Sequence, residues 1–276
     1  MKKRFLTFLF LTFTAGTYAQ NPDSLTFVRA DWNTEQLAPG IEWRYYHFKG
    51  KEQLFGKNEY INVLIVDQQK GHTRFAIASK EGEKILTSAA AKQAGAIAAV
   101  NGYFYNTEPP YNSLSYLKID GQILRSNDPI GPFIIIDEAG KLRIASVNAS
   151  LLAEPTLLGF WPVLVSAGKI NVGPSNDLHP RTAIGTDGDR VVLITVDGRR
   201  NKSKGMDMIE MASVCQWLGL DIAANLDGGG STTMYIQGQP DNGIVNHPSD
   251  SFLGFSHRGE RKVGHSILVL SETDKQ

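Results

Sequence analysis

The sequence has a single cysteine, no excess of charge and no apolar run long enough to span a membrane. Cys215 is the only cysteine among 276 residues, so no disulfide can form within the chain. It lies in an apolar helical stretch, where we expect a packing residue and not a nucleophile. The 28 basic and 28 acidic residues balance, so the whole molecule does not attract polyanions. We expect no nucleic-acid partner and a fold that depends on its hydrophobic core.

Several functional motifs are also missing. The chain has no GxxxxGK[ST] phosphate loop, no GxGxxG between a strand and a helix, no GxSxG elbow and no HxxxH, CxxC or DxDxDG spacing. These absences argue against ATP, dinucleotides, esterase chemistry and a structural metal site. No cofactor is required by the sequence, although Asp197 and Asp227, both at strand ends, could coordinate a divalent cation such as calcium.

The first 19 residues have the layout of a secretory signal peptide. Lys2, Lys3 and Arg4 precede an apolar run over residues 5–13, and a small-residue pattern ends at Ala19. The apolar stretch of about 15 residues is shorter than the roughly 20 needed to cross a bilayer. We expect cleavage after Ala19 and an exported protein, periplasmic or extracellular, without a stable membrane anchor. The mature chain would carry 25 basic and 28 acidic residues, a net charge of −3.

Hydrophobic periodicity predicts one strand-rich α+β domain with a mostly antiparallel or mixed sheet and a few helices. Residues 20–54 are expected to be a lead-in segment with little pattern up to residue 40 and then a first strand, forming one compact unit with residues 55–276. A short helix is predicted at residues 87–94 and one long helix at about residues 206–218. The predicted strands are residues 41–48, 60–66, 73–78, 96–100, 114–119, 133–136, 142–144, 163–165, 182–185, 191–196, 222–226, a strand from 232, and 263–270.

The most informative stretch is residues 225–233, NLDGGGSTT, where an apolar strand ends in polar residues and three glycines. Glycines are tolerated where the backbone takes positive φ or contacts a ligand. Their successive N–H groups can converge on an anion, with hydroxyl groups as further donors. The alternative is a plain turn between two strands. The candidates here are Asn225, Asp227, Gly228, Gly229, Gly230, Ser231 and Thr232.

Other polar clusters also follow or precede predicted strands. Asp197-Gly198-Arg199 ends the most apolar strand and could equally be a hairpin turn. Arg181, in the run His179-Pro180-Arg181-Thr182, could bind a phosphate through two parallel hydrogen bonds, or form a surface salt bridge. Three further candidates are less specific. Asn101-Gly102 opens an aromatic loop that could bind a ligand or form a simple turn, whereas Asn246 and Arg261 are polar residues in loops.

In this order the motifs resemble the phosphodiester glycosidase family over about residues 55–271. The resemblance rests on Asn101-Gly102, on HPRTAIG at 179–185, on Asp197-Gly198-Arg199, on Glu210 in the second helix, on NLDGGGS at 225–231, on Asn246 and on Glu260-Arg261. At Tyr103 the chain departs from the second glycine that many members have.

The resemblance implies hydrolysis of a sugar-1-phosphodiester to a free sugar and a phosphomonoester. Attack at the anomeric carbon needs a carboxylate beside the sugar ring. Asp227 is the leading candidate, with Asp197 or Glu210 orienting water and His179 supplying a proton or a hydrogen bond. The substrate-binding candidates are Asn101, Gly102, His179, Arg181, Thr182, Asn225, Gly228, Gly229, Gly230, Ser231, Thr232, Asn246 and Arg261.

Two alternatives remain open for the function. The chain could be a non-catalytic carbohydrate- or cell-wall-binding module, which has no need for the three carboxylates to converge. It could also be a phosphodiesterase that breaks the P–O bond instead of the C–O bond. In each case the expected partner is a small-molecule or glycan sugar phosphodiester.

Overall fold

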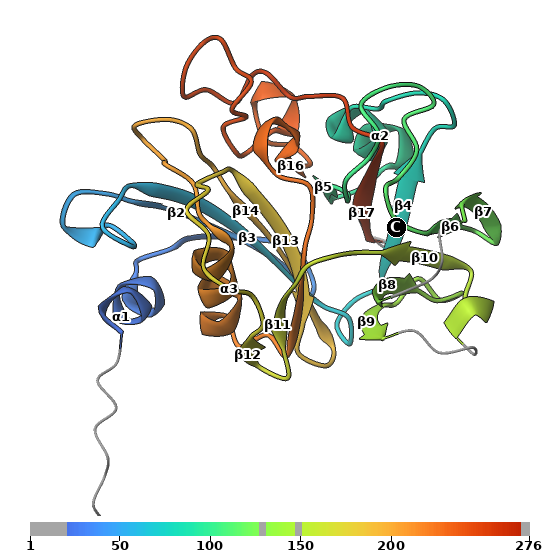
Figure 1. Ribbon diagram of the computed structural model, residues 1–276, viewed down its shortest axis with the longest axis horizontal. Coiled ribbons are helices and arrows are strands. Elements are labelled where there is room, and N and C mark those ends of the chain that lie inside the picture. Colours follow the sequence, from blue (N-terminus) through green and yellow to red (C-terminus); the bar gives the residue numbers. More distant parts are fainter. Residues whose placement is uncertain (1–20, 127–130, 147–150, 272–276) are drawn as a thin grey trace, which may run out of the picture.

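The structure is a computed structural model that describes residues 21–126, 131–146 and 151–271. The expected signal peptide therefore lies outside the described residues. Within them the chain forms three sheets and three α-helices, and every strand pairing is antiparallel (Figure 1). The prediction of a strand-rich fold is confirmed. Of the two predicted kinds of sheet, antiparallel or mixed, the described residues form only antiparallel pairs. None of the described helices is long and apolar enough to cross a membrane.

The largest sheet has eight strands, and its central strands read as nearly continuous apolar runs. Most residues of its three central strands, 59–67, 181–186 and 190–196, are buried, because hydrophobic clusters cover both faces of this sheet. In spatial order the strands are β1 (Asn33–Ala38), β2 (Ile41–Phe48), β3 (Glu59–Asp67), β14 (Arg190–Val196), β13 (Arg181–Thr186), β15 (Ile222–Asn225), β11 (Val163–Ser166) and β12 (Lys169–Ile170).

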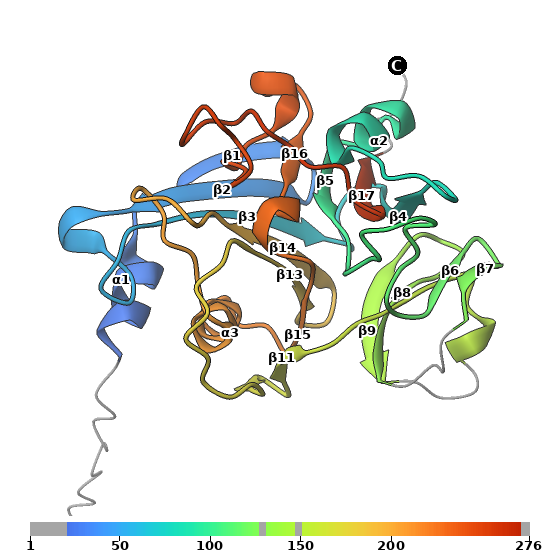
Figure 2. The ribbon, with the colours of Figure 1, turned by 45° about the horizontal axis from the view of Figure 1, so that its top comes forward.

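The helices α1 (Pro22–Arg29) and α3 (Met208–Trp217) pack against one face of the eight-stranded sheet (Figure 2). In α3 (Met208–Trp217), Asp207 and Glu210 form a reciprocal capping box at the N-terminus. Cys215 of α3 is fully buried in this layer, as predicted, and burial raises the pKa of its thiol to about 12.

The lead-in segment, residues 20–54, contains a helix and a strand that were not predicted from the sequence. No helix or strand was predicted over residues 20–40, but α1 (Pro22–Arg29) and β1 lie there. Only Phe27 of α1 is buried, and four of the six residues of β1 are exposed. Elements with so little buried surface leave almost no periodic signal in the sequence.

Two smaller sheets complete the fold. One has the order β16 (Met234–Ile236), β5 (Ala98–Asn101), β17 (His265–Ser271), β4 (Thr73–Ser79), with α2 (Thr87–Ala94) on its outer face. The other has the order β7 (Gln122–Arg125), β6 (Leu117–Ile119), β10 (Thr156–Gly159), β8 (Pro132–Ile136), β9 (Leu142–Ser146). A single hydrophobic cluster joins all three sheets, with Leu193, Ile267 and Ile134 as members from each.

The predicted motifs meet where the chain passes from the eight-stranded to the four-stranded sheet. After β15, residues 226–233 lead into β16 of the other sheet. Leu226 N–H donates to Thr182 O at the start of β13, and Asp227 N–H donates to Gly102 O just beyond β5. The start of β13 is paired with the end of β14 through Arg181 and Val196. Antiparallel pairing thus brings four distant segments to one junction.

Candidate active site

Asn101 is a fully buried amide that holds this junction together. Its Nδ2 donates to Asp227 O at 2.7 Å, and its Oδ1 accepts from Thr182 Oγ1 at 2.8 Å and from Thr233 N at 3.1 Å. One side chain therefore connects β5, β13 and the segment after β15. Its hydrogen-bonding capacity is directed to the protein.

Other polar residues of the expected substrate site also face inward. Asn246 accepts from Met234 N at 2.8 Å and donates to Thr232 O at 2.9 Å, and Asn225 donates to Leu226 O at 2.9 Å. Five of the expected substrate-binding residues are at most 1% exposed: Asn101, Thr182, Asn225, Thr232 and Asn246. Among them, Asn225 Oδ1 and Thr232 Oγ1 have no hydrogen-bond partner in the described part of the chain, and substrate contact by these residues stays a prediction.

The three consecutive glycines, Gly228 to Gly230, form what we call the glycine turn. Gly229 N–H donates to Pro180 O at 2.9 Å, and two N–H groups that follow the turn, those of Ser231 and Thr232, donate back to Gly228 O and Gly229 O. The expected cradle of free N–H groups is therefore largely committed to protein acceptors.

The glycines instead make room for two arginine side chains. A Cβ built on Gly229, where φ is +60°, would lie 3.1 Å from Arg199 Nη2. A Cβ on Gly230 would lie 2.3 Å from Arg261 Nη2 and equally close to Asp250 Oδ1. A side chain at Gly230 would force the Arg261–Asp250 pair to move, and one at Gly229 would press against Arg199 in addition to being strained by the positive φ. The turn thus presents bare backbone to two guanidinium groups.

Asp227 is a largely buried carboxylate at the entry to the glycine turn. Burial raises its pKa to about 6, while hydrogen bonding from Ser231 and Gly228 N–H and the charge of Arg261 oppose the rise. Its charge in turn helps to raise the pKa of Tyr103 and Tyr105, after the larger effect of their own burial. A carboxylate with a near-neutral pKa can exchange a proton at physiological pH.

The other two candidate carboxylates are engaged elsewhere. Asp197 is 1% exposed and accepts from His247 N–H, with its Oδ2 2.7 Å from His247 Nδ1. Glu210 pairs with Lys57 at 2.5 Å and caps α3 by accepting from Asp207 N–H. Among the described residues, Asp197, Glu210 and Asp227 have no hydrogen-bond or ion-pair partner in common. These contacts therefore give no support to the expectation that Asp197 or Glu210 orients water for Asp227.

Arg181 is an anchor for the backbone in this structure. It is 7% exposed, and it donates to Met206 O at 2.8 Å and to Asp177 O at 2.9 Å. Burial lowers its pKa. Backbone carbonyls thus occupy its Nε and Nη2, and phosphate binding by Arg181 stays a prediction.

Arg199 is the residue that the sequence interpretation missed. Its exposed guanidinium lies against Gly229, and its Nη2 is 3.2 Å from His179 Nδ1. A guanidinium can only donate, so Nδ1 accepts and His179 is neutral, with its proton on Nε2. Burial and the neighbouring arginines lower the pKa of His179 in agreement. Arg199 could have been found from the sequence, because it directly follows Asp197-Gly198 at the end of β14.

The remaining expected residues flank the glycine turn. Arg261 pairs with Asp250 at 2.7 Å. Gly102 needs to be a glycine, because a Cβ there would lie 2.5 Å from His265 Cδ2. The next residue, Tyr103, donates its N–H to His265 Nε2 at 3.1 Å and its hydroxyl to Trp161 O at 2.9 Å. Burial lowers the pKa of His265 to about 4, so this imidazole is neutral.

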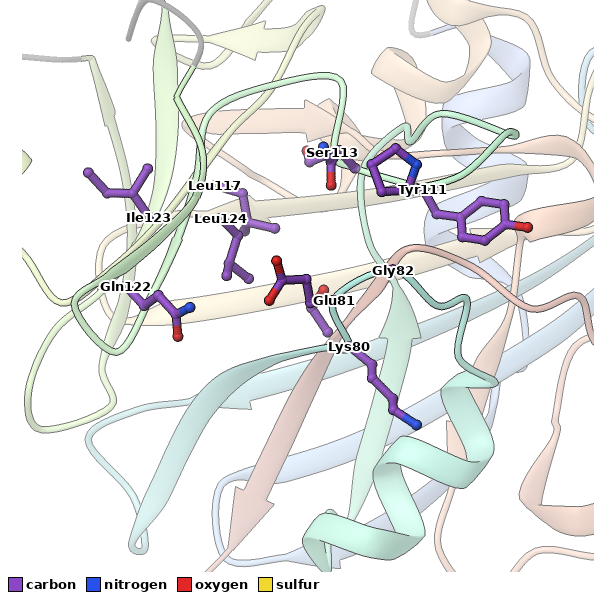
Figure 3. A pocket seen from close by; sticks show the side chains of 12 residues that line it. Lys80, Glu81, Gly82, Tyr111, Ser113, Leu117, Gln122, Ile123 and Leu124 are labelled. Carbon is purple, nitrogen blue, oxygen red and sulfur yellow. The ribbon is translucent and has the colours of Figure 1, made fainter.

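A pocket of about 190 Å³ lies beside this junction, on the other part of the loop that carries Tyr103. Figure 3 shows its walls, which come from the β4–α2 connection, from residues 110–113 and from the β6–β7 hairpin. None of the expected site residues lines it. Across the described ranges no group of three or more His, Cys, Asp or Glu side chains is arranged to hold a metal ion, and the suggested calcium ion stays untested.

Parts of the chain are similar in sequence to known proteins. Mouse N-acetylglucosamine-1-phosphodiester alpha-N-acetylglucosaminidase is 32% identical over 95 residues, which are 34% of this chain and 17% of the enzyme. An uncharacterized prophage-derived protein of Bacillus subtilis is 43% identical over 100 residues, 36% of this chain and 14% of that protein. The chain thus matches about one sixth of the length of these relatives.

Solved structures share the fold. The zebrafish N-acetylglucosamine-1-phosphodiester alpha-N-acetylglucosaminidase catalytic domain, auto-inhibited by its pro-peptide, superimposes with a TM-score of 0.64 at 17% identity, covering 87% of this chain and 88% of that one. A hypothetical protein from Synechocystis gives 0.65 at 15% identity, covering 88% and 64%. The phosphodiester glycosidase family model matches residues 94–270, well over half of the chain. The chain therefore belongs to the phosphodiester glycosidase family.

Proposed function

We propose that the protein hydrolyses a glycosyl phosphodiester, releasing a free sugar and a phosphomonoester. The observation that carries the proposal is a partly buried carboxylate, Asp227, with a pKa of about 6, at a glycine turn flanked by Arg199 and Arg261. The two cations suit the phosphate and the carboxylate suits the sugar carbon that is attacked. Arg199 replaces Arg181 as the proposed phosphate ligand, because its guanidinium is exposed.

In the proposed reaction, water forms a bond to the anomeric carbon as the bond from that carbon to the phosphate oxygen breaks. Ionised Asp227 takes the proton from water, and the phosphomonoester leaves with the bridging oxygen. The two guanidinium groups stabilise the charge that develops on the leaving phosphate. A phosphomonoester leaves readily, so a strong general acid is not needed on that side. This accounts for a site whose other candidate carboxylates, Asp197 and Glu210, have partners elsewhere.

Replacement of Asp227 by Asn tests this role. We expect Asp227→Asn to lower kcat for a glycosyl phosphodiester by about 100-fold or more, since an amide cannot accept the proton. Asp189→Asn, which alters an exposed carboxylate in the turn before β14, is the matched control and should leave kcat unchanged. Free sugar is the readout, with circular dichroism to verify folding. A folded Asp227→Asn protein with wild-type turnover would exclude the proposed mechanism.

A second candidate is a carbohydrate-binding module without activity. The engagement of Asp197 by His247 and of Glu210 by Lys57 favours it, because a binder needs no set of converging carboxylates. Binding of sugar phosphodiesters with no release of sugar by the wild-type protein would establish this candidate. Hydrolysis in isotopically labelled water separates C–O from P–O cleavage, since the label enters the sugar in one case and the phosphate in the other.

We also propose that the protein is exported and that residues 20–54 form one unit with residues 55–276. Export is supported by the signal-like residues 1–19 and by a structural neighbour from Burkholderia pseudomallei that is described as exported, with a TM-score of 0.65 at 15% identity. The single unit is supported by the hydrophobic cluster in which residues of β2 pack with all three sheets.

A further inference from the structure

Residues 197–205 form a hairpin that connects both sides of the glycine turn. Arg199 N–H donates to Lys204 O, and Arg200 pairs with Ser203 across the hairpin. The Arg199 side chain reaches Gly229 on one side. On the other side the Arg200 guanidinium donates to Ser249 O and Ser251 O, which flank Asp250, the partner of Arg261. The position of this hairpin therefore sets the position of both arginines at the turn.

The hairpin rests on a fully buried glutamate at the start of β3. Glu59 Oε2 accepts from Gly205 N–H at 3.0 Å and lies 3.0 Å from Ser203 Oγ. Ser203 Oγ accepts from Tyr60 N–H at 2.9 Å and lies 2.7 Å from Asp197 O. Glu59 has no exposed surface and is outside the proposed reaction, so its carboxyl group needs another explanation.

The hydrogens around Ser203 determine the protonation state of Glu59. The single hydroxyl hydrogen of Ser203 faces two oxygens, Asp197 O and Glu59 Oε2, and a carbonyl oxygen can only accept. An ionised Glu59 would leave one of these two short contacts without a hydrogen. A protonated Glu59 donates to Ser203, which then donates to Asp197 O, so every contact contains one hydrogen.

The two charges near Glu59 oppose one another, because Lys57 lowers its pKa and Glu210 raises it. Its Oε1 has no hydrogen-bond partner, and Lys57 Nζ is 3.8 Å away but only 2.5 Å from Glu210 on α3. Lys57 is thus already neutralised by Glu210, whose own charge also opposes ionisation of Glu59. Phe48, the neighbour across β2, is apolar. A buried charge without a full partner is costly, and burial accordingly raises the pKa of Glu59 to about 8.

We propose that Glu59 is a positioning residue, held protonated, whose hydrogen bond to Ser203 fixes the hairpin that places Arg199 against the glycine turn. The inference rests on the proposed function, in which Arg199 binds the phosphate. Ionisation of Glu59 puts two acceptors, its carboxylate and Asp197 O, in competition for one hydroxyl hydrogen and loosens the hairpin. The consequence is weaker substrate binding at alkaline pH.

The test is the pH dependence of KM for a glycosyl phosphodiester in wild type, Glu59→Gln and Glu59→Ala. Wild-type KM should rise above about pH 8 by roughly tenfold, the equivalent of one lost hydrogen bond. In Glu59→Gln the amide nitrogen donates to Ser203 at every pH but cannot accept from Gly205 N–H, as Glu59 Oε2 does. KM should therefore lie between those of the neutral wild type and Glu59→Ala, and the alkaline rise should vanish. Glu59→Ala should have a raised KM throughout. Glu83→Gln, at an exposed carboxylate, is the control and should follow the wild type.

Two results would overturn the proposal. One is an alkaline rise in KM that Glu59→Gln retains, and the other is a KM of Glu59→Gln that equals that of Glu59→Ala at pH 7. Carboxyl ¹³C NMR of the full chain provides a readout that does not depend on turnover. A resonance that is lost in Glu59→Gln should titrate near pH 8, and titration below pH 5 would refute the protonated state even if the protein has no glycosidase activity. Absence of turnover with a resonance titrating near pH 8 would instead refute the proposed function alone.

Discussion

Arg181 and Arg199 show how surroundings decide what one kind of side chain does. Both lie near Pro180 and the glycine turn, and both carry a permanent positive charge. Arg181 donates to two backbone carbonyls, whereas Arg199 is exposed, and its guanidinium donates to His179 Nδ1 and lies against Gly229. The first can stabilise the fold and the second can bind a ligand.

Replacing each arginine by Gln should separate these two effects. Arg199→Gln should raise KM for a glycosyl phosphodiester by about 10- to 100-fold, because a charge-assisted hydrogen bond to phosphate is lost, and should leave the melting temperature unchanged. Arg181→Gln should lower the free energy of unfolding by about 2 kcal/mol, because buried carbonyls lose a charged donor. Steady-state kinetics and denaturant unfolding measure both. A raised KM in Arg181→Gln together with an unchanged KM in Arg199→Gln would show that Arg181 binds the phosphate instead.

At the scale of the element, the glycine turn matters because its residues lack side chains and so let neighbouring groups approach the backbone. Its N–H groups are mostly bonded within the protein, so the three glycines are explained by close neighbours: Pro180 O at Gly228, Arg199 at Gly229, and Arg261 with Asp250 at Gly230. Substitution of Gly230 tests the crowding of neighbouring side chains without backbone strain. Its φ lies outside the left-handed region, whereas Gly229 has a positive φ.

Gly230→Ala should therefore impair binding through side-chain displacement. The new methyl group would overlap the Arg261–Asp250 ion pair, which must move, so we expect KM to rise by about tenfold. Gly173→Ala is the matched control, because no atom lies within 4 Å of a Cβ at that position. Its kinetics should equal those of the wild type. An unchanged KM in Gly230→Ala would show that the ion pair plays no part in binding.

At the scale of the whole molecule, two buried carboxylates link stability to pH. Asp227 and Glu59 have folded-state pKa values raised to about 6 and about 8 from reference values of 3.8 and 4.5. The folded state keeps their protons over pH ranges in which the unfolded state loses them. The stabilisation from each group is complete below its unfolded pKa and is lost as pH rises through its folded pKa.

We expect the wild-type free energy of unfolding to contain a contribution that falls between about pH 4.5 and pH 8. In Glu59→Gln the part that belongs to Glu59 should be absent, and only the contribution of Asp227 below about pH 6 should remain. Denaturant unfolding of both proteins, measured from pH 4 to pH 9, gives the difference between the two curves. A difference that is constant above pH 6 would contradict a raised pKa at Glu59.

The elements of the fold were largely readable from the chain. The helix predicted at residues 87–94 coincides with α2, and the strand predicted at 41–48 coincides with β2, because each has strong local periodicity or composition. The pairing of strands into three sheets was not readable, since hydrogen-bonded partners such as β3 and β14 are more than 120 residues apart. The buried glutamate at position 59 was missed for the same reason.

The sequence by itself determined the family, the strand-rich class and the order of motifs, because these depend on residues that are near one another in the chain. Only the tertiary structure decided what each polar residue does. It turned Asn101 and Arg181 inward to backbone partners, brought Arg199 to Gly229, and left Asp227 with a near-neutral pKa. Burial and hydrogen-bond partners depend on what distant segments bring together, and local sequence carries no record of that.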